Sequence, residues 1–280
     1  MSQTKDLHGF FIPFRHDKMK DKSYSLSDQD DFYSEVERLK FQAGYWVPTE
    51  LAWLRQLVDP TNLKLLDYGC GQGSATSLYA EHFNTTWGVD HNPSLLGKAK
   101  AAFPTIEFSE AAEMFESQLF AFSPDVILLR YVVQHVAVED FWMLEKLFEV
   151  AKLQKKCVVI VDADAGDDKI FPPNTSFESL VSMGNRYTIS RGGSRNVSCK
   201  IAEIYREFAV NAGQFHFDRC YHKFDAANVQ EFSIVCRGLL NVPRKLSFEF
   251  DEQEILKFFN SQNGIFLWAM LFCLFDFRDR

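Results

Sequence analysis

Cysteines are few in this sequence, and none of the six forms a C-x-x-C pair. We therefore expect neither a disulfide framework nor a cysteine-based zinc site, and scattered free thiols are typical of a reducing compartment. Positive charge is in deficit as well, because 30 Lys and Arg stand against 38 Asp and Glu, a formal net charge of −8. Phosphate contacts need a basic face, so this balance disfavours a nucleic-acid partner.

Long apolar runs are also missing. The longest, residues 264–275, is shorter than the roughly 20 residues of a transmembrane helix. The first residues lack the apolar core of a signal peptide. We therefore expect no membrane partner and a cytoplasmic protein. The 280 residues, 46% hydrophobic and 24% charged, have the composition of an ordinary globular chain with a sizeable core.

Apolar segments and helical patterns alternate between residues 61 and 165. Continuous apolar runs at 126–129 and 158–161 are typical of strands buried on both faces of a sheet. Residues 139–153, between them, carry apolar side chains at helical spacing. This order predicts an α/β fold with a doubly wound, mostly parallel sheet.

A glycine-rich turn is the most informative segment. Gly69, Gly71 and Gly73 alternate with other residues, two leucines and Asp67 precede them, and a helix is expected from Ala75. Glycine lets the backbone approach a ligand closely, and free N–H groups at the start of a helix point at it. The segment therefore predicts a site for a polar small molecule.

Two kinds of ligand are considered for this turn. A dinucleotide fingerprint has the spacing G-x-G-x-x-G, whereas this chain has G-x-G-x-G. The Asp67 carboxylate would repel a pyrophosphate but suits a ligand with an ammonium group and ribose hydroxyls. Asp90 ends a short apolar strand about 20 residues further on and can accept hydrogen bonds from both ribose hydroxyls.

With these residues the sequence resembles the class I S-adenosylmethionine-dependent methyltransferases of the bacterial small-molecule type. Asp67 and the three glycines match the first motif of that family, and Asp90 matches its ribose-binding acid. The resemblance extends over residues 33–235. It implies S-adenosylmethionine as the cofactor and a Rossmann-like, seven-stranded sheet whose last two strands pair in antiparallel fashion.

The chain also departs from the family pattern. Residues 153–156 (LQKK) stand where a Pro-Gly-Gly turn is common, and neither Glu110 nor Glu113 is in register with the usual adenine-binding acid. A backbone N–H near Ala112 is the expected adenine contact instead. His91, next to Asp90, is counted among the cofactor-binding residues.

We expect a single domain over residues 1–280. Residues 1–60 are predicted to form an N-terminal helical cap, with helices over 31–44 and 49–57 and Pro48 in the first turn of the second helix. Residues 61–165 are the cofactor-binding half. Residues 166–280 are predicted to hold a loop-and-helix insertion after the fifth strand, a helix over 201–213 and the last two strands, over 214–224 and 265–277.

The segment after the fourth strand carries the first candidates for chemistry. His135 lies where open α/β sheets bind ligands, and its usual pKa suits a general base at neutral pH. The alternative is that His135 caps or packs under the next helix. Arg130 is predicted to bind a carboxylate of the cofactor or of the acceptor, or else to form a surface ion pair. Tyr131, at the same edge, is predicted to contact the acceptor.

Further acceptor-binding candidates lie on two other segments. Asp162 and Asp164 end the fifth strand, and either could bind an amine or hydroxyl of the acceptor or cap the following loop. The resemblance implies that the N-terminal helix closes over the cofactor. Tyr33, Arg38 and Gln42 lie on that helix and are predicted to contact cofactor or acceptor, or otherwise to be solvated. Arg38 and Gln42, four residues apart, share one face.

The predicted strand over residues 214–224 holds four alternating residues of zinc-binding type, namely His216, Asp218, Cys220 and His222. Side chains on one face of a strand lie about 6–7 Å apart, so one ion could not readily reach all four. We expect no metal.

Together these patterns predict S-adenosylmethionine-dependent methyl transfer to an oxygen or nitrogen atom of a small-molecule acceptor. Three alternatives stay open: methylation of a protein side chain, binding of the cofactor without catalysis, and, more remotely, a nicotinamide-dependent oxidoreductase. The oligomeric state does not follow from the sequence.

Overall fold

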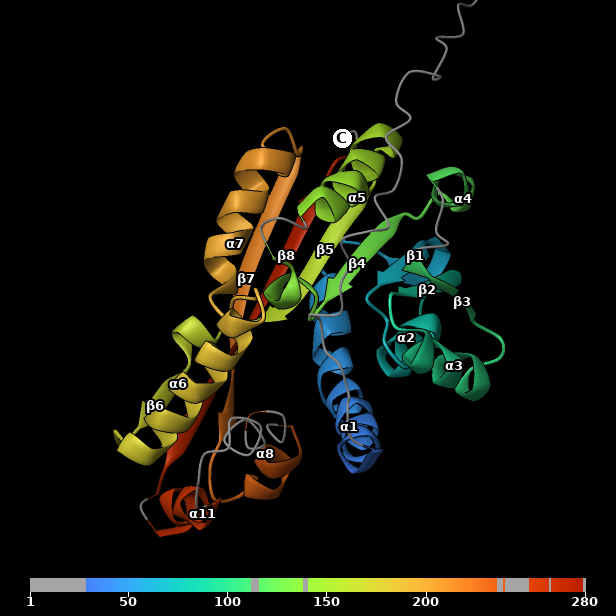
Figure 1. The fold of residues 1–280 in the computed structure, drawn as a ribbon. Coiled ribbons are helices and arrows are strands. Elements are labelled where there is room, and N and C mark those ends of the chain that lie inside the picture. The colour runs from blue at the N-terminus through green and yellow to red at the C-terminus, as the bar shows by residue number, and fades with distance from the viewer. Residues whose placement is uncertain are drawn as a thin grey trace, which may run out of the picture.

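The computed structural model describes residues 29–111, 116–137, 141–235, 239, 252–261 and 263–278, with the backbone alone at 29–35, 116, 117 and 252. Its centre is an eight-stranded sheet with the order β3-β2-β1-β4-β5-β8-β6, and β7 pairs with β8 (Figure 1). Helices cover both faces. The predicted α/β fold with a doubly wound sheet is confirmed.

Five strands form the parallel part of the sheet. They are β1 (Lys64–Tyr68), β2 (Thr85–Asp90), β3 (Glu107–Glu110), β4 (Val126–Arg130) and β5 (Cys157–Ala163). Crossovers run through α2 (Ser74–Ala80), α3 (Pro93–Ala102), α4 (Glu116–Phe122) and α5 (Phe141–Gln154). The strand order reverses between β1 and β4, and ligands bind outside the carboxyl ends of the strands at such a reversal.

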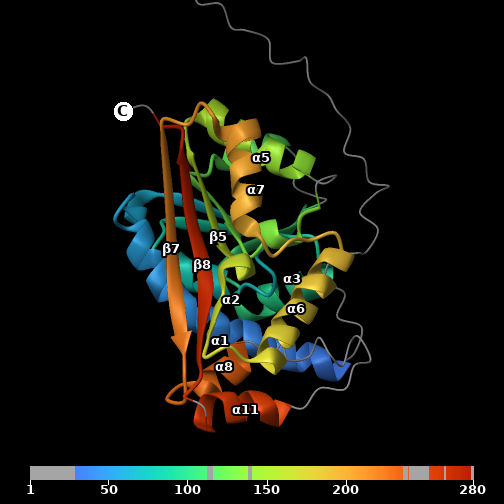
Figure 2. The same ribbon diagram turned by 90° about the vertical axis from the view of Figure 1, so that its left-hand side faces the viewer.

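A long antiparallel strand, β8 (Ile265–Asp276), joins this part to the rest of the chain. Its second half pairs with β5, and its first residues pair with the short β6 (Lys169–Phe171). β7 (Gln214–Phe224) lies along its other edge, as Figure 2 shows. The bounds of β7 and its antiparallel pairing match the prediction. β6 makes the sheet one strand larger than expected, because three residues are too few to produce a strand pattern.

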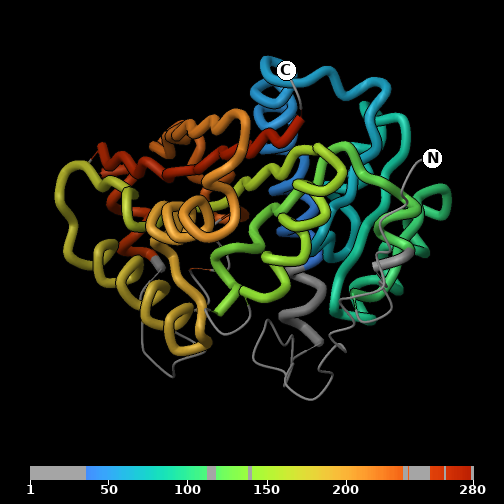
Figure 3. Tube along the Cα trace, turned by 90° about the horizontal axis from the view of Figure 1, so that it is seen from above, coloured from blue at the N-terminus to red at the C-terminus, as the bar shows by residue number. Residues whose placement is uncertain are grey.

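The predicted insertion after β5 is helical. It contains α6 (Thr175–Ser190) and α7 (Val197–Ile204), which continues into a π-helical turn, Tyr205–Ala209. The helix expected over 201–213 thus begins earlier, at Val197. α8 (Val229–Val235) and α11 (Glu252–Ser261) follow. Seen from above, the insertion and the last strands gather on one side of the molecule and the elements β1 to α3 on the other (Figure 3).

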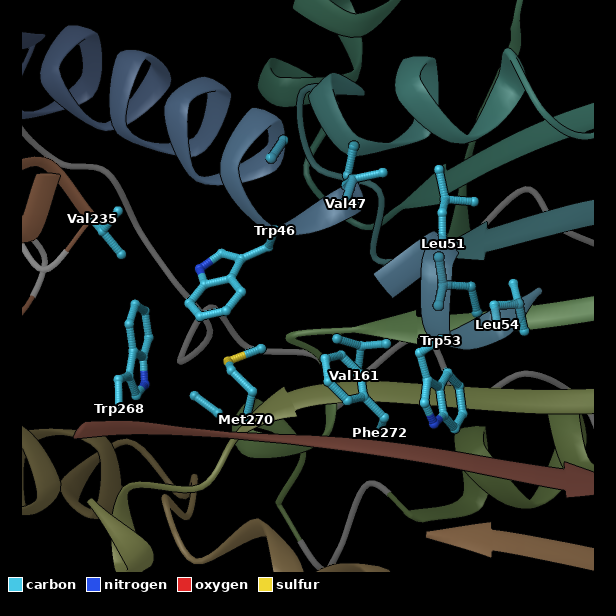
Figure 4. Packing of buried hydrophobic residues seen from close by; sticks show 14 of the residues in the cluster. Trp46, Val47, Leu51, Trp53, Leu54, Val161, Val235, Trp268, Met270 and Phe272 are labelled. Carbon is cyan, nitrogen blue, oxygen red and sulfur yellow. The ribbon is translucent and has the colours of Figure 1, made fainter. Parts of the chain in front are cut away.

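The N-terminal helix differs from the prediction. One helix, α1 (Gln29–Leu54), replaces the two expected, and Pro48 lies inside it. Residues 1–28 of the predicted cap lie outside the described residues. Buried side chains on both sides of Pro48 pack on β8, among them Trp46 and Trp53 (Figure 4). This packing holds the helix together across a residue that lacks an N–H donor, and sequence signals alone did not reveal it.

Phenylalanines form the core between the insertion helices and the end of the sheet. Phe177 of α6 is fully buried. Its ring centroid lies 4.9 Å from that of Phe266 in β8, 5.3 Å from Phe258 and 5.6 Å from Phe232. These contacts fix α6, α8 and α11 to the part of β8 that extends beyond β5.

Replacing Phe177 with alanine should leave a cavity in this cluster. We expect the free energy of unfolding, from urea denaturation followed by circular dichroism, to fall by about 3–5 kcal/mol. Ile189→Ala on the same helix is the matched control, because Ile189 is 62% exposed; its effect should stay within about 0.5 kcal/mol. Equal effects of the two substitutions would contradict the described packing.

Candidate functional site

The glycine turn lies at the carboxyl end of β1. Gly69, Gly71 and Gly73 have φ angles of 85°, 57° and 78°, a region that side-chain-bearing residues rarely adopt. The amide N–H groups of Gly69 and Cys70 both donate to the carbonyl oxygen of Val89 in β2, at 2.7 and 3.0 Å. The alternating glycines are thus a backbone requirement of a turn that folds back onto the neighbouring strand.

Asp90 holds the middle of this turn. Its Oδ2 accepts a hydrogen bond from the Gly71 amide at 2.7 Å, and its Oδ1 accepts one from the Asn92 amide at 2.8 Å. Each carboxylate oxygen has a second lone pair for a ligand hydroxyl. A Cβ atom placed on Gly71 would meet no atom within 4 Å, so the turn faces open space there. An open glycine backbone beside a partly satisfied carboxylate fits a ribose-containing cofactor.

Two further residues of the predicted cofactor set lie near this turn. His91 Nδ1 is 3.5 Å from Asp90 Oδ1, and its side chain is 41% exposed. Asp67 is buried below the turn, and its Oδ2 accepts a hydrogen bond from the Thr76 hydroxyl of α2 at 2.6 Å. Burial raises the pKa of Asp67 to about 6. Asp67 therefore fastens β1 to α2, and a direct cofactor contact stays a prediction.

Arg130 belongs to a buried ion pair that sequence reasoning missed. Its Nε donates to both carboxylate oxygens of Glu50 in α1, at 3.1 and 2.9 Å. The Tyr79 hydroxyl of α2 donates to Glu50 Oε2 at 2.5 Å. Glu50 lies on the same face of α1 as the apolar Val47 and Leu54. A charged residue on an otherwise apolar helix face was the sequence signal that could have indicated a buried ion pair. The Nη2 atom of Arg130 is buried and has no hydrogen-bond partner in the described part of the chain.

Tyr131 continues β4 at the same edge. Its φ angle of 54° is unusual for a residue other than glycine, and such conformations concentrate at functional sites. The hydroxyl donates to the Met270 sulfur at 3.3 Å, and the Arg130 guanidinium lies 4.7 Å from the ring centroid.

A short 3-10 turn, Val133–His135, places His135 beyond β4. Asp162 Oδ2 accepts a hydrogen bond from the Gln134 amide at 3.0 Å, and Asp162 Oδ1 accepts one from the Ala163 amide at 2.8 Å. Burial raises the pKa of this carboxyl to about 7. Lys200 of α7 donates to the carbonyl oxygens of Val133 and Val136. Asp162 and Lys200 thus fix the backbone of the turn through hydrogen bonds. Contact of Asp162 with an acceptor stays a prediction.

His135 as a whole residue is exposed to solvent, although many protein atoms lie around its side chain. Burial lowers its pKa to about 4, with the positive charges of Arg195, Lys200, Arg38 and Arg191 acting in the same direction. The imidazole is therefore neutral at pH 7 and can accept a proton. The structure brings Arg38 and His135, predicted separately, into one electrostatic neighbourhood.

α1 lies against the glycine turn. The Gln72 side chain donates to the carbonyl oxygen of Val36 at 2.8 Å. Arg38 Nη1 donates to Gln42 Oε1 at 3.0 Å, which confirms that these two residues share a face, and Gln42 is buried. The side chain of Tyr33 and the whole of Ala112 lie outside the described residues.

Asp164 binds the start of α7 and an arginine of β7 rather than capping the loop directly after β5 as one of the two predictions expected. Its Oδ1 accepts a hydrogen bond from the Val197 amide at 3.0 Å, and Arg219 pairs with its Oδ2. In the zinc-type set of β7, Asp218 accepts from the Trp53 indole at 2.6 Å and His222 bonds with Tyr45. Within the described ranges no group of three His, Cys, Asp or Glu side chains could hold a metal ion.

Comparisons with known proteins agree with this geometry. Residues 44–155, from α1 to the end of α5, match the family model described as methyltransferase domain. No curated protein has a matching sequence. A solved candidate methyltransferase from Bacillus halodurans C-125 is 14% identical, with 82% of this chain and 100% of that one covered and a TM-score of 0.51.

Two other solved structures align less well. Magnesium protoporphyrin IX methyltransferase from Synechocystis PCC 6803 is 13% identical, covers 91% of this chain and 90% of its own, and has a TM-score of 0.47. Phosphoethanolamine N-methyltransferase 2 from Haemonchus contortus is 17% identical over 88% of this chain and 60% of its own, also with a TM-score of 0.47.

The family match contains the glycine turn, Asp90 and the strand reversal. Residues 44–155 are therefore similar to a methyltransferase domain, which supports methyltransferase activity with S-adenosylmethionine as the cofactor. No helix among the described residues is both long and apolar enough to cross a membrane.

Substitutions at the turn should weaken cofactor binding. Asp90→Ala removes charge-assisted hydrogen bonds worth about 1.5–3 kcal/mol, so the Kd for S-adenosylmethionine should rise roughly tenfold to hundredfold in calorimetric titration. Gly71→Arg fills the open space and should abolish measurable binding, whereas Gly71→Ala adds only backbone strain. As a control, Glu107→Gln should bind S-adenosylmethionine as the wild type does, because Glu107 lies at the end of β3 that is remote from Asp90. Unchanged affinity in both Asp90→Ala and Gly71→Arg would contradict this cofactor site.

Proposed function

We propose that the protein transfers a methyl group from S-adenosylmethionine to an oxygen or nitrogen atom of a small molecule. The observation that carries the small-molecule part is that protein covers the carboxyl edge of the sheet from two sides. On one side α1 contacts the glycine turn, where the Gln72 side chain donates to the Val36 carbonyl at 2.8 Å. On the other, the loop after α6 contacts the His135 turn, where the Ser194 amide donates to the Gln134 carbonyl at 2.8 Å. A protein substrate needs an open groove.

Each part of the cofactor can be assigned to a residue described above. Asp90 would hold the ribose hydroxyls, and the backbone of Gly71 would lie against the cofactor. The unpartnered Nη2 of Arg130 suits the carboxylate of its methionine part, and a backbone N–H near Ala112 would meet the adenine. The bound cofactor supplies an electrophilic methyl group on its sulfonium sulfur.

His135 is the proposed general base. The neutral imidazole can take the proton that a hydroxyl group loses as it attacks, or the proton that an ammonium group must lose before its nitrogen can attack. Asp162 and Lys200 fix the backbone on which His135 stands and so act as positioning residues. A conjugate acid with a pKa of about 4 releases its proton readily to water, and the same low pKa makes His135 a weaker base than an ordinary histidine.

Removal of the imidazole should slow the chemical step. We expect His135→Ala to lower kcat by about 10²–10⁴-fold at saturating cofactor, with His82→Ala at the protein surface as the control. Because the base form persists above its pKa of about 4, the wild-type rate should stay level from pH 8 down to about pH 5 and fall below it. Near-wild-type turnover of His135→Ala would remove this residue as the base.

A further inference from the structure

One arginine near His135 makes no direct ion pair with a described acid. Within the described ranges no hydrogen-bond or ion-pair partner exists for the guanidinium of Arg195, and its Nε atom is buried. By contrast Arg130, Arg219 and Arg278 each pair with an acid. Burying part of an unpaired cation costs free energy. Such a cost is unexpected in a chain with eight more acidic than basic residues.

Close backbone packing places Arg195 beside the proposed base. The Ser194 amide donates to the Gln134 carbonyl at 2.8 Å. A Cβ atom on Gly193 would lie only 2.5 Å from that same oxygen, so the loop approaches the His135 turn more closely than a larger residue permits. The charge of Arg195 is, after burial, the largest influence on the pKa of His135.

The other charges around His135 leave a positive excess. Lys200 is engaged by two carbonyl oxygens, and both oxygens of Asp162 accept backbone N–H groups. Arg38 of α1 bonds with Gln42. Arg191 donates to the Tyr187 hydroxyl at 3.3 Å and pairs with no acid in the described chain. Asp168, which faces Arg195, is buried and accepts the Ala269 amide.

We infer that the methyl acceptor carries an anionic group, a carboxylate or a phosphate, which Arg195 binds with the support of Arg191. This inference rests on the proposed function. A guanidinium offers paired donors that match the oxygens of either anion. An acceptor held by its anionic end would present a hydroxyl or amine to His135, which explains why a cation is kept beside a base whose pKa it lowers.

The cofactor carboxylate is a less fitting partner for Arg195. The Gly166 amide donates to the Arg195 carbonyl, and the neighbouring Val197 amide donates to Asp164, so this loop is attached beyond β5. The glycine turn follows β1, and β4 lies between β1 and β5. Two strand spacings amount to about 10 Å. Cofactor affinity should therefore be independent of Arg195.

The test measures anion binding through the His135 imidazole. Acetate and inorganic phosphate are titrated separately, at constant ionic strength in chloride, into protein saturated with S-adenosylhomocysteine, and the ring is followed by NMR. We expect saturable binding that raises the pKa of His135. Arg195→Gln should weaken it by at least about tenfold and Arg195→Lys by less, because lysine keeps the charge but loses the paired donors. The tighter of the two probes identifies the class of anion.

Controls separate this effect from general changes. Arg206→Gln, which removes an exposed arginine paired with Glu207, should bind anions as the wild type does. Arg195→Gln should keep the wild-type affinity for S-adenosylmethionine and a melting temperature no lower than that of the wild type, because no partner is lost. Anion binding that is absent, or equal in wild type and Arg195→Gln, would overturn the inference.

Turnover assays distinguish failure of the inference from failure of the proposed function. Matched hydroxy acids, amino acids and phosphate monoesters are compared with their neutral amides and esters. We expect methylation of the anionic members, with the preference lost in Arg195→Gln. Preferred turnover of neutral members would overturn the inference but not the proposed function. Arg195-dependent anion binding without turnover of any acceptor would overturn the proposed function, and with it the assignment of the anion to an acceptor.

Discussion

The buried pair of Glu50 and Arg130 is the interaction on which the rest of the site depends. It joins α1, which covers the glycine turn, to β4, which leads to His135, and through Tyr79 it includes α2. Breaking a buried ion pair by removing one partner commonly costs about 3–5 kcal/mol, because the other charge is left unpaired. The carboxyl edge of the sheet and the helix that covers it are therefore joined by an ion pair between residues 80 positions apart, in addition to the Gln72–Val36 hydrogen bond and the packing of α1 on β8.

Features encoded within short stretches could be predicted from the sequence. The glycine turn and Asp90 were recognised because backbone geometry and residue type coincide there, and β7 because apolar and polar residues alternate along it. Continuity of α1 through Pro48 could not be predicted, since it depends on packing against β8. Glu50, Lys200 and Arg195 were missed for the same reason: their roles come from partners, or from the lack of one, that only the fold brings near.

The two parts of the sheet carry different tasks. In the proposed function, the parallel strands present backbone groups and the Asp90 carboxylate to the cofactor, and the sequence signals for these features are local. In the proposed function, the acceptor side is assembled from α1, the loop after α6 and the support of the His135 turn. The charges around His135 come from three separate segments, Arg38 in α1, Arg191 and Arg195 at and after the end of α6, and Lys200 in α7. Specificity built from scattered segments leaves little trace in any one of them.

β8 has a further consequence for how this protein can change over evolutionary time. One strand of 12 residues is paired with β5, β6 and β7. A single-residue insertion near its middle would turn the following side chains to the opposite face in the pairings with β5 and β7. Insertions or deletions in β8 would therefore disrupt its strand pairing, whereas length changes in the connecting loops would not. A change of acceptor would then come from exchanging side chains and loops around β8, whose length is constrained by its pairings.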